Sequence, residues 1–197
     1  MTDIKYLDNF PFETIKFLKK LKKNNNRNWF QKNRTSYEEQ FLKPAQAFIE
    51  QLGFHLHDIY CDFNAIPKID KSIFRLHRDV RFSKNKEQYK TNLGILFWVG
   101  EGKKMESCGL YFHIDSKKFF IATGMYMFTK DQIKMYRELI SIEDNGKELN
   151  KIIKQIEKKI ITLVEKPLRK YLVVMIRNIN LQVYFYTAES MLLKNQA

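Results

Sequence analysis

Apolar and polar positions repeat with two different periods along the chain, and the changes of period divide it into three segments. Over residues 10–60 apolar side chains recur every three or four positions, which predicts helices. They are Phe12, Ile15, Leu18, Leu21, Trp29, Phe30, Tyr37, Phe41, Phe48 and Leu52. The run Asn24-Asn25-Asn26 predicts a break after the first helix, and Pro44 predicts a kink or the start of a new helix.

Between residues 61 and 125 apolar positions alternate with polar ones, which predicts strands. One row is Phe74, Leu76, Val80 and Phe82, and the opposite row is Arg75, His77, Asp79 and Arg81. Residues 93–99 are apolar on both faces, as expected of a covered, central strand. Residues 110–114 and 119–124 predict a hairpin whose turn lies at residues 115–118.

The helical period returns over residues 129–165, and Thr129 followed by Gln132 is typical of a capping box at a helix start. Helices, then antiparallel strands, then helices predict an α+β fold. We therefore expect helices packed on an antiparallel sheet of about four or more strands. They would form a single domain that spans residues 1–170.

The chain has 197 residues, of which 44% are apolar and 29% are charged. It can therefore bury a core, and global disorder is excluded. No apolar run reaches the ~18 residues that a membrane helix needs, and the first residues lack the pattern of a signal peptide. We therefore expect a cytoplasmic protein with no membrane partner.

Neither a metal nor a cofactor is predicted. The two cysteines, Cys61 and Cys108, are too few for a disulfide framework or a zinc site. His55 and His57 lie near Asp58 and Cys61, in a spacing that metal ligands use, but no third ligand is evident. The chain also lacks a glycine-rich loop of the kind that binds phosphate.

The net charge of +13, from 35 basic and 22 acidic residues, raises the question of a nucleic-acid partner. The basic residues are mostly lysine, with 27 Lys against 8 Arg, a profile typical of an AT-rich genome. The excess is also spread out, at +3 in residues 1–60, +5 in residues 61–125 and +5 in residues 126–197. A nucleic-acid partner therefore stays open and is not favoured.

One segment concentrates the residues that recognise small anions. Three of the eight arginines, Arg75, Arg78 and Arg81, lie within a stretch of seven residues. Arginine binds carboxylate and phosphate groups through two parallel hydrogen bonds, so the segment predicts a ligand that carries one of these groups. Arg78 interrupts an apolar row, which favours a ligand because a guanidinium rarely faces a core unpaired. The predicted binding residues are Arg75, Arg78, Arg81, Lys84, Tyr89 and Lys90, with Asp79 orienting the guanidinium groups.

Two other functions use the same residues. In the first, the protein is a hydrolase or a phosphoryl-handling enzyme with Asp79 or His77 as its base. In the second, it is a structural or partner-binding protein, and Asp79 pairs with Arg75 or Arg81 on a solvated sheet face. His113 alternates into a predicted strand and is interpreted as packed or solvated rather than catalytic. Neither the identity of a ligand nor the oligomeric state follows from the sequence.

A longer pattern surrounds these residues. Its centre is Ile73-Phe74-Arg75, Arg78-Asp79, Arg81-Phe82-Ser83-Lys84, Lys86 and Tyr89-Lys90-Thr91. Before it stand Asn24-Asn25, Arg27, Trp29-Phe30, Asn33-Arg34 and Tyr37, and after it Gly109-Leu110-Tyr111 and Gly124-Met125-Tyr126. Over residues 10–165 this pattern resembles the family known as domain of unknown function 2461. The resemblance implies a cytosolic bacterial protein with one α+β domain, and it implies no reaction. Gln88 stands where that family usually has proline, and His77 where it commonly has Tyr or Asn.

The resemblance ends after Lys170. Members of that family continue with a Val-Pro-x-Gly-Tyr-Asp-x-x-His stretch, whereas this chain continues with Tyr171-Leu172-Val173-Val174-Met175-Ile176. If each codon is started one base earlier, Met175 followed by Ile176 forces the aspartate, and the codons on either side of it permit the other residues of the stretch. We therefore expect residues 171–197 to be an atypical, frameshifted tail that lies loosely on the surface or pairs at a sheet edge. A divergent native strand is the alternative.

Overall fold

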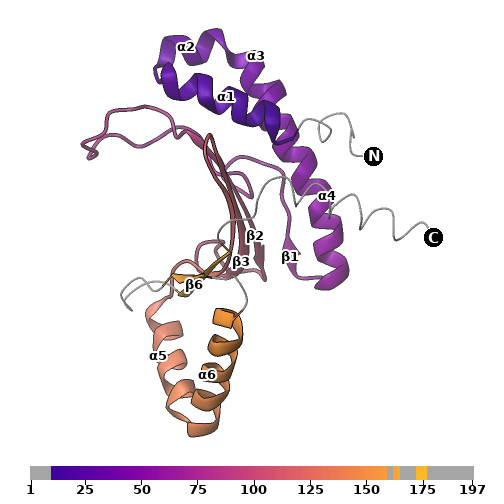
Figure 1. Cartoon of the computed structure of the whole chain (residues 1–197), viewed down its shortest axis with the longest axis vertical. Coiled ribbons are helices and arrows are strands. Elements are labelled where there is room, and N and C mark those ends of the chain that lie inside the picture. Colours follow the sequence, from indigo (N-terminus) through magenta and orange to yellow (C-terminus); the bar gives the residue numbers. More distant parts are fainter. Residues whose placement is uncertain (1–9, 159–161, 165–171, 177–197) are drawn as a thin grey trace, which may run out of the picture.

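The computed structural model describes residues 10–158, 162–164 and 172–176. Its helices are α1 (Phe12–Lys23), α2 (Arg27–Lys32), α3 (Arg34–Tyr37), a π-helical turn (Glu38–Leu42), α4 (Lys43–Ile59), α5 (Lys130–Ser141) and α6 (Glu143–Lys158). Its strands are β1 (Phe63–Asn64), β2 (Asn92–Val99), β3 (Cys108–Asp115), β4 (Phe119–Met125), β5 (Thr162–Val164) and β6 (Leu172–Ile176). They form one antiparallel sheet in the order β1-β2-β3-β4-β6-β5. Helices α1–α4 lie on one side of the sheet, and α5 and α6 extend from one end of it (Figure 1). The predicted α+β fold is confirmed.

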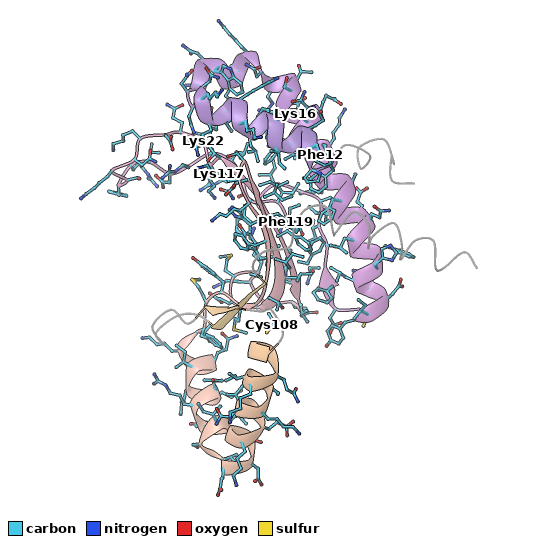
Figure 2. The ribbon with its side chains drawn as sticks, viewed as in Figure 1. Phe12, Lys16, Lys22, Cys108, Lys117 and Phe119 are labelled. Atoms are coloured by element: carbon cyan, nitrogen blue, oxygen red, sulfur yellow. The ribbon has the colours of Figure 1, made fainter. Side chains whose placement is uncertain are left out.

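The core lies between α1–α4 and one face of the sheet, where Phe119 is among the packed side chains (Figure 2). Its fully buried side chains include Phe17, Leu18, Leu21, Phe41, Ile49, Leu93, Ile95 and Phe97. The apolar stripe of α1 is rotated from the predicted one. Phe12 is 54% exposed, whereas Thr14 and Phe17 are fully buried. The sequence pattern did not predict this stripe because it includes the polar residue Thr14.

Pro44 lies in the first turn of α4, so of the two predictions, a kink or the start of a new helix, the second is correct. Proline has no backbone N–H, so it cannot donate to the carbonyl of Gln40, four residues before it. The chain widens there into the π-helical turn, and the Thr14 hydroxyl donates to the Gln40 carbonyl at 2.7 Å. Because Thr14 is fully buried, this bond explains why a hydroxyl belongs in the core stripe.

The predicted hairpin over residues 110–124 is confirmed as β3 and β4. In its turn, the Asp115 carboxylate accepts the N–H groups of Lys117 and Lys118 at 2.7 and 2.9 Å. The last part of the predicted 129–165 helix is instead β5, whose Thr162 and Val164 are β-branched. Cys108, at the start of β3, is exposed at the end of the sheet nearest α5 (Figure 2).

Two segments differ from simple strand predictions. Residues 74–82 form no strand, although Ile73 bridges to Ile95 and the Phe74 N–H donates to the Gly94 carbonyl at 3.0 Å. In the predicted tail, β6 pairs with β4 on one side and with β5 on the other. Residue 171 and residues 177–197 of that tail lie outside the described residues.

Candidate functional site

The segment that carries the predicted anion-binding residues folds as a hairpin-like loop. Its arms are joined by the Lys90 N–H, which donates to the Leu76 carbonyl at 2.7 Å, and the Arg78 N–H, which donates to the Gln88 carbonyl at 2.8 Å. Beyond this pairing the loop projects away from the rest of the molecule (Figure 1). Residues 76–90 are called the arginine hairpin below.

Asn25 fastens the arginine hairpin to the helices. Its side-chain Nδ2 donates to the Tyr89 carbonyl at 2.9 Å, and its Oδ1 accepts the Tyr89 N–H at 2.9 Å. One amide side chain therefore satisfies both backbone groups of Tyr89. Next to it, Asn26 caps α2 by accepting the Trp29 N–H at 2.9 Å. The asparagine run that was predicted to end the first helix thus also places α2 against the hairpin.

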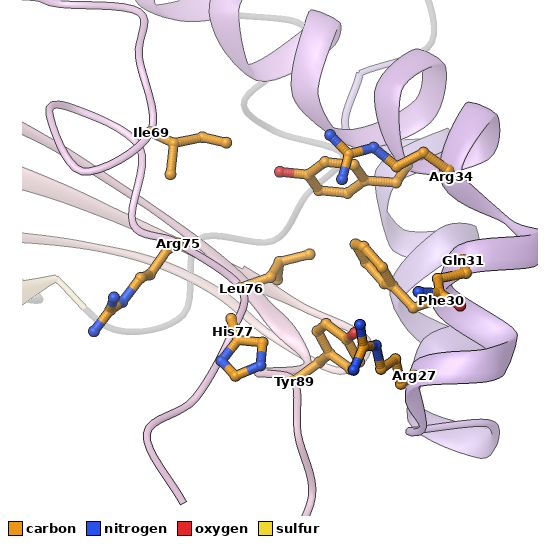
Figure 3. A pocket seen from close by; sticks show the side chains of 10 residues that line it. Arg27, Phe30, Gln31, Arg34, Ile69, Arg75, Leu76, His77 and Tyr89 are labelled. Carbon is orange, nitrogen blue, oxygen red and sulfur yellow. The ribbon is translucent and has the colours of Figure 1, made fainter.

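A pocket of about 340 Å³ opens between α2, α3 and the arginine hairpin (Figure 3). It is called the α2–hairpin pocket below. Its lining residues are Arg27, Phe30, Gln31, Arg34, Tyr37, Ile69, Arg75, Leu76, His77 and Tyr89. Arginines from two segments far apart in the sequence, Arg27 and Arg34 in one and Arg75 in the other, therefore border one hollow.

Aromatic rings form one wall of the α2–hairpin pocket. Phe30 and Tyr89 stack with ring centroids 4.3 Å apart and ring planes 13° apart. Phe30 also contacts Tyr37, and His77 meets Tyr89 edge-on at 5.6 Å. Burial raises the pKa of Tyr37, so its hydroxyl keeps its proton at neutral pH. The wall is mostly apolar, which suits a ring or a hydrocarbon part of a ligand.

The three arginines of the pocket differ in their partners. Arg34 Nε donates to Glu38 Oε1 at 2.7 Å, and this bond raises the Arg34 pKa further. Its guanidinium also lies over the Tyr37 ring, 5.4 Å from the ring centroid. Arg27 and Arg75 form no salt bridge within the described part of the chain. Figure 3 places Arg27 and Arg34 on the helix side of the pocket and Arg75 on the opposite side, extending outward.

Several predicted binding residues lie elsewhere on the arginine hairpin. Arg81 binds Asp79 through two bonds, Nε to Oδ1 at 3.0 Å and Nη2 to Oδ2 at 2.6 Å. These bonds lower the pKa of Asp79 and raise that of Arg81. Arg78 pairs with Glu87 at 3.5 Å, and Lys84 is exposed. Neither these three predicted binding residues nor their partners Asp79 and Glu87 line the α2–hairpin pocket.

Lys90 also lies outside the lining of the pocket. Its ammonium stands 5.8 Å from the centroid of the Phe74 ring. Burial lowers the pKa of Lys90, and the positive charges of Arg75 and Arg78 lower it further. The structure therefore divides the predicted cluster, with Arg75, His77 and Tyr89 in the pocket and the rest outside it.

Arg27, Phe30 and Arg34 line the pocket and were not among the predicted binding residues. A charged residue on a short helix is normally solvated, so periodicity alone gives no reason to select the two arginines. Their one signal was that all three belong to the family pattern that precedes the arginine segment.

Within the residues that the structure describes, no group of three His, Cys, Asp or Glu side chains is placed to hold a metal ion. His55 and His57 are exposed near the end of α4, and Cys61 is exposed after it. In the same residues, no helix is both long and apolar enough to cross a membrane.

The fold and the site define an α+β protein whose helices cover one face of an antiparallel sheet and hold an arginine-bordered pocket against a hairpin loop. The chain belongs to the family described as conserved hypothetical protein, domain of unknown function 2461, whose profile matches residues 13–176. The match confirms the resemblance and extends it through β6. No curated protein and no solved structure matches the chain.

Proposed function

We propose that the protein binds a small molecule with a phosphate or carboxylate group and a planar or apolar part, in the α2–hairpin pocket. One observation carries this proposal: the same pocket is lined by two arginines and by two stacked rings. Arg27 and Arg75 form no salt bridge in the described residues. The stacked rings are those of Phe30 and Tyr89. Arginines without a carboxylate partner retain their donors for a ligand's anionic group. The rings offer a surface for the rest of the ligand.

The structural alternative fits part of the cluster only. Arg81 and Arg78 are paired with Asp79 and Glu87, as expected if they serve the loop itself. Such pairing does not extend to Arg75, which borders the pocket. The proposal therefore assigns ligand binding to Arg75 and assigns loop structure to Arg78 and Arg81.

The enzymatic alternative has weaker support from the geometry. Asp79 is bound to Arg81 outside the pocket lining, so it is not positioned as a base for a ligand there. His77 lines the pocket, but no hydrogen bond to a described side chain orients its ring. General-base catalysis needs a base that is held in position, so binding is the function proposed.

Thermal unfolding in the presence of three probes tests the proposal. The probes are phenyl phosphate, inorganic phosphate and benzoate, each compared with sodium chloride at equal ionic strength. Phenyl phosphate is expected to raise the Tm most, because it engages both the arginines and the rings. Inorganic phosphate engages the arginines alone.

Three single variants locate the effect. Arg27→Ala and Arg75→Ala are expected to abolish the Tm increase with phenyl phosphate. Arg81→Ala is the matched control, because it removes an arginine of the same hairpin that is already paired with Asp79. An equal Tm increase in all three variants, or none in the unaltered protein, would contradict the proposal.

A further inference from the structure

A second group of titratable side chains lies on β3, apart from the α2–hairpin pocket. Tyr111, His113 and Asp115 alternate along the strand, so they share the sheet face opposite to that of the buried Phe112 and Ile114. Tyr111 Oη lies 3.3 Å from His113 Nδ1, and His113 Nε2 lies 3.2 Å from Asp115 Oδ2. All three side chains are half-buried. They form a continuous hydrogen-bonded chain.

The direction of each hydrogen bond follows from the charges. Burial would raise the pKa of Asp115, but the N–H groups of Lys117 and Lys118 and the His113 ring hold it below its usual value. Asp115 is therefore a carboxylate at neutral pH and accepts a hydrogen bond from the Nε2–H group of His113. Burial lowers the pKa of His113 in spite of Asp115, so the ring is neutral at neutral pH and Nδ1 is an acceptor. The Tyr111 hydroxyl must then donate to Nδ1.

The neighbouring strands hold the chain in place. Phe120 on β4 stacks on the His113 ring, with centroids 4.6 Å apart and planes 13° apart. On β2, Gly94 lies under Tyr111, and a Cβ at this position would stand 2.8 Å from the Tyr111 hydroxyl oxygen and 3.2 Å from Phe74. A residue without a side chain is therefore needed for Tyr111 to lie across β2 beside Phe74. Burial there raises the pKa of Tyr111 to about 12.

Two lysines stand over the same aromatic ring. The ammonium of Lys104 is 4.6 Å from the Phe74 ring centroid and that of Lys90 is 5.8 Å from it, while Tyr111 meets Phe74 edge-on. Lys104 donates to the carbonyls of Asp70 and Lys71 at 2.8 and 2.7 Å. Burial lowers the pKa of both lysines, whereas the negative charge of Asp70 raises it. Neither lysine forms a salt bridge within the described residues. An anion that contacts both would therefore gain two partly desolvated charges.

We propose that this face is a second anion site, where Lys90 and Lys104 bind a tetrahedral oxyanion beside Tyr111 and where protonation of His113 strengthens the binding. Its residues do not line the α2–hairpin pocket. A phosphate group, free or on a larger molecule, has the required chemistry.

Protonation of His113 reverses one hydrogen bond. The imidazolium carries a proton on Nδ1 as well as on Nε2, so Nδ1 donates to the Tyr111 oxygen instead of accepting from it. The Tyr111 hydroxyl proton is then available to the bound anion. The charge of the imidazolium adds a second attraction. Anion affinity is therefore expected to rise as the pH falls through the His113 pKa, which lies below the ordinary histidine value.

The groups that face His113 from each element are few. They are Tyr111 and Asp115 on β3, Phe120 on β4, Gly94 as its register partner on β2, and the charge of Lys118 in the β3–β4 turn. Asp115 stays a carboxylate between pH 5 and pH 8, because its pKa lies below its usual value. His113 is thus the group that titrates in this range.

Site-resolved NMR with sulfate tests the proposal, because sulfate keeps its charge between pH 5 and pH 8. The readouts are the backbone amides of Gly94 and Tyr111, titrated against sodium chloride at equal ionic strength. We expect sulfate to bind about fivefold or more tightly at pH 5 than at pH 7.5, as one added hydrogen bond of about 1 kcal/mol would give. His113→Gln should remove this pH dependence, and Tyr111→Phe should reduce it to the part that the imidazolium charge contributes.

Lys104→Met should weaken sulfate binding at both pH values, and Lys103→Met is the matched control, an exposed neighbour that pairs with Glu106 at 3.6 Å. A second measurement needs no variant. Because linkage is reciprocal, saturating sulfate must raise the His113 pKa in the unaltered protein. An unchanged His113 pKa, or no response at Gly94 and Tyr111, would overturn the proposal.

Discussion

At the scale of the residue, Arg78 forms an ordinary surface ion pair and not a buried pair that holds the fold together. Its side chain is 28% exposed and that of its partner Glu87 is 47% exposed, at a distance of 3.5 Å. Ion pairs this open to water stabilise a fold by about 0–1 kcal/mol. Arg78→Ala is therefore expected to lower the free energy of unfolding by less than about 1 kcal/mol in urea titrations. A loss of ~3 kcal/mol would instead indicate a buried, uncompensated carboxylate.

Asn25 carries more of the structure than its sequence context suggests. Asn25→Ala removes both bonds to the Tyr89 backbone, which is partly buried. We expect the free energy of unfolding to fall by about 1–3 kcal/mol, because two backbone groups lose their partner. Urea unfolding measures this, with Asn85→Ala as the control, since Asn85 bonds only within the exposed loop. If Asn25→Ala lowers the free energy of unfolding no more than Asn85→Ala does, the attachment of the hairpin by Asn25 contributes nothing to stability.

Sequence reasoning reached some of these residues and not others. Arg75 and Tyr89 were predicted to bind a ligand and do line the pocket, because arginine clustering is visible in one dimension. The role of Asn25 was not predictable, since the residue it binds is 64 positions away. Only the packing of α2 against the arginine hairpin brings the two together.

At the scale of the element, one hydroxyl of α1 binds the π-helical turn that precedes α4. Thr14→Val keeps the shape of the side chain and removes the donor to the partly buried Gln40 carbonyl. The expected cost is about 1–3 kcal/mol, as for a partly buried acceptor that loses its donor. Thr35→Val on α3 is the control, because Thr35 is exposed. Thermal or urea unfolding compares the two, and a Thr14→Val protein as stable as the control would refute this account of the π-helical turn.

Alternation predicted the strands well where a partner strand exists and poorly where none does. β3 and β4 pair along their whole lengths, so the period of two survives in the structure. In residues 74–82 the same period leads to no strand, and Phe82 is 95% exposed. There Asp79 and Asn85 accept N–H groups two residues further on, which favours turns over a ladder. The period does place Tyr111, His113 and Asp115 on one face, a consequence that the initial interpretation of His113 overlooked.

At the scale of the whole molecule, the origin of residues 171–197 is an open hypothesis. A frameshift after the Lys170 codon was predicted from a change of pattern there, whereas the family profile continues to residue 176 and β6 pairs with both β4 and β5. We expect resequencing of the gene to reveal a gained or lost base near this codon. We also expect a chain cut after Lys170 to keep a cooperative unfolding transition. A cut chain that fails to fold would identify the tail as a native element.

The central claim is that the α2–hairpin pocket binds an anion that carries a ring, and mapping of bound phenyl phosphate by NMR tests it most directly. The account predicts that the largest amide shifts cluster at Phe30, Gln31, His77 and Tyr89, which line the pocket from both sides. Shifts confined to residues 79–87 at the tip of the arginine hairpin, or no saturable shifts in the pocket, would contradict it.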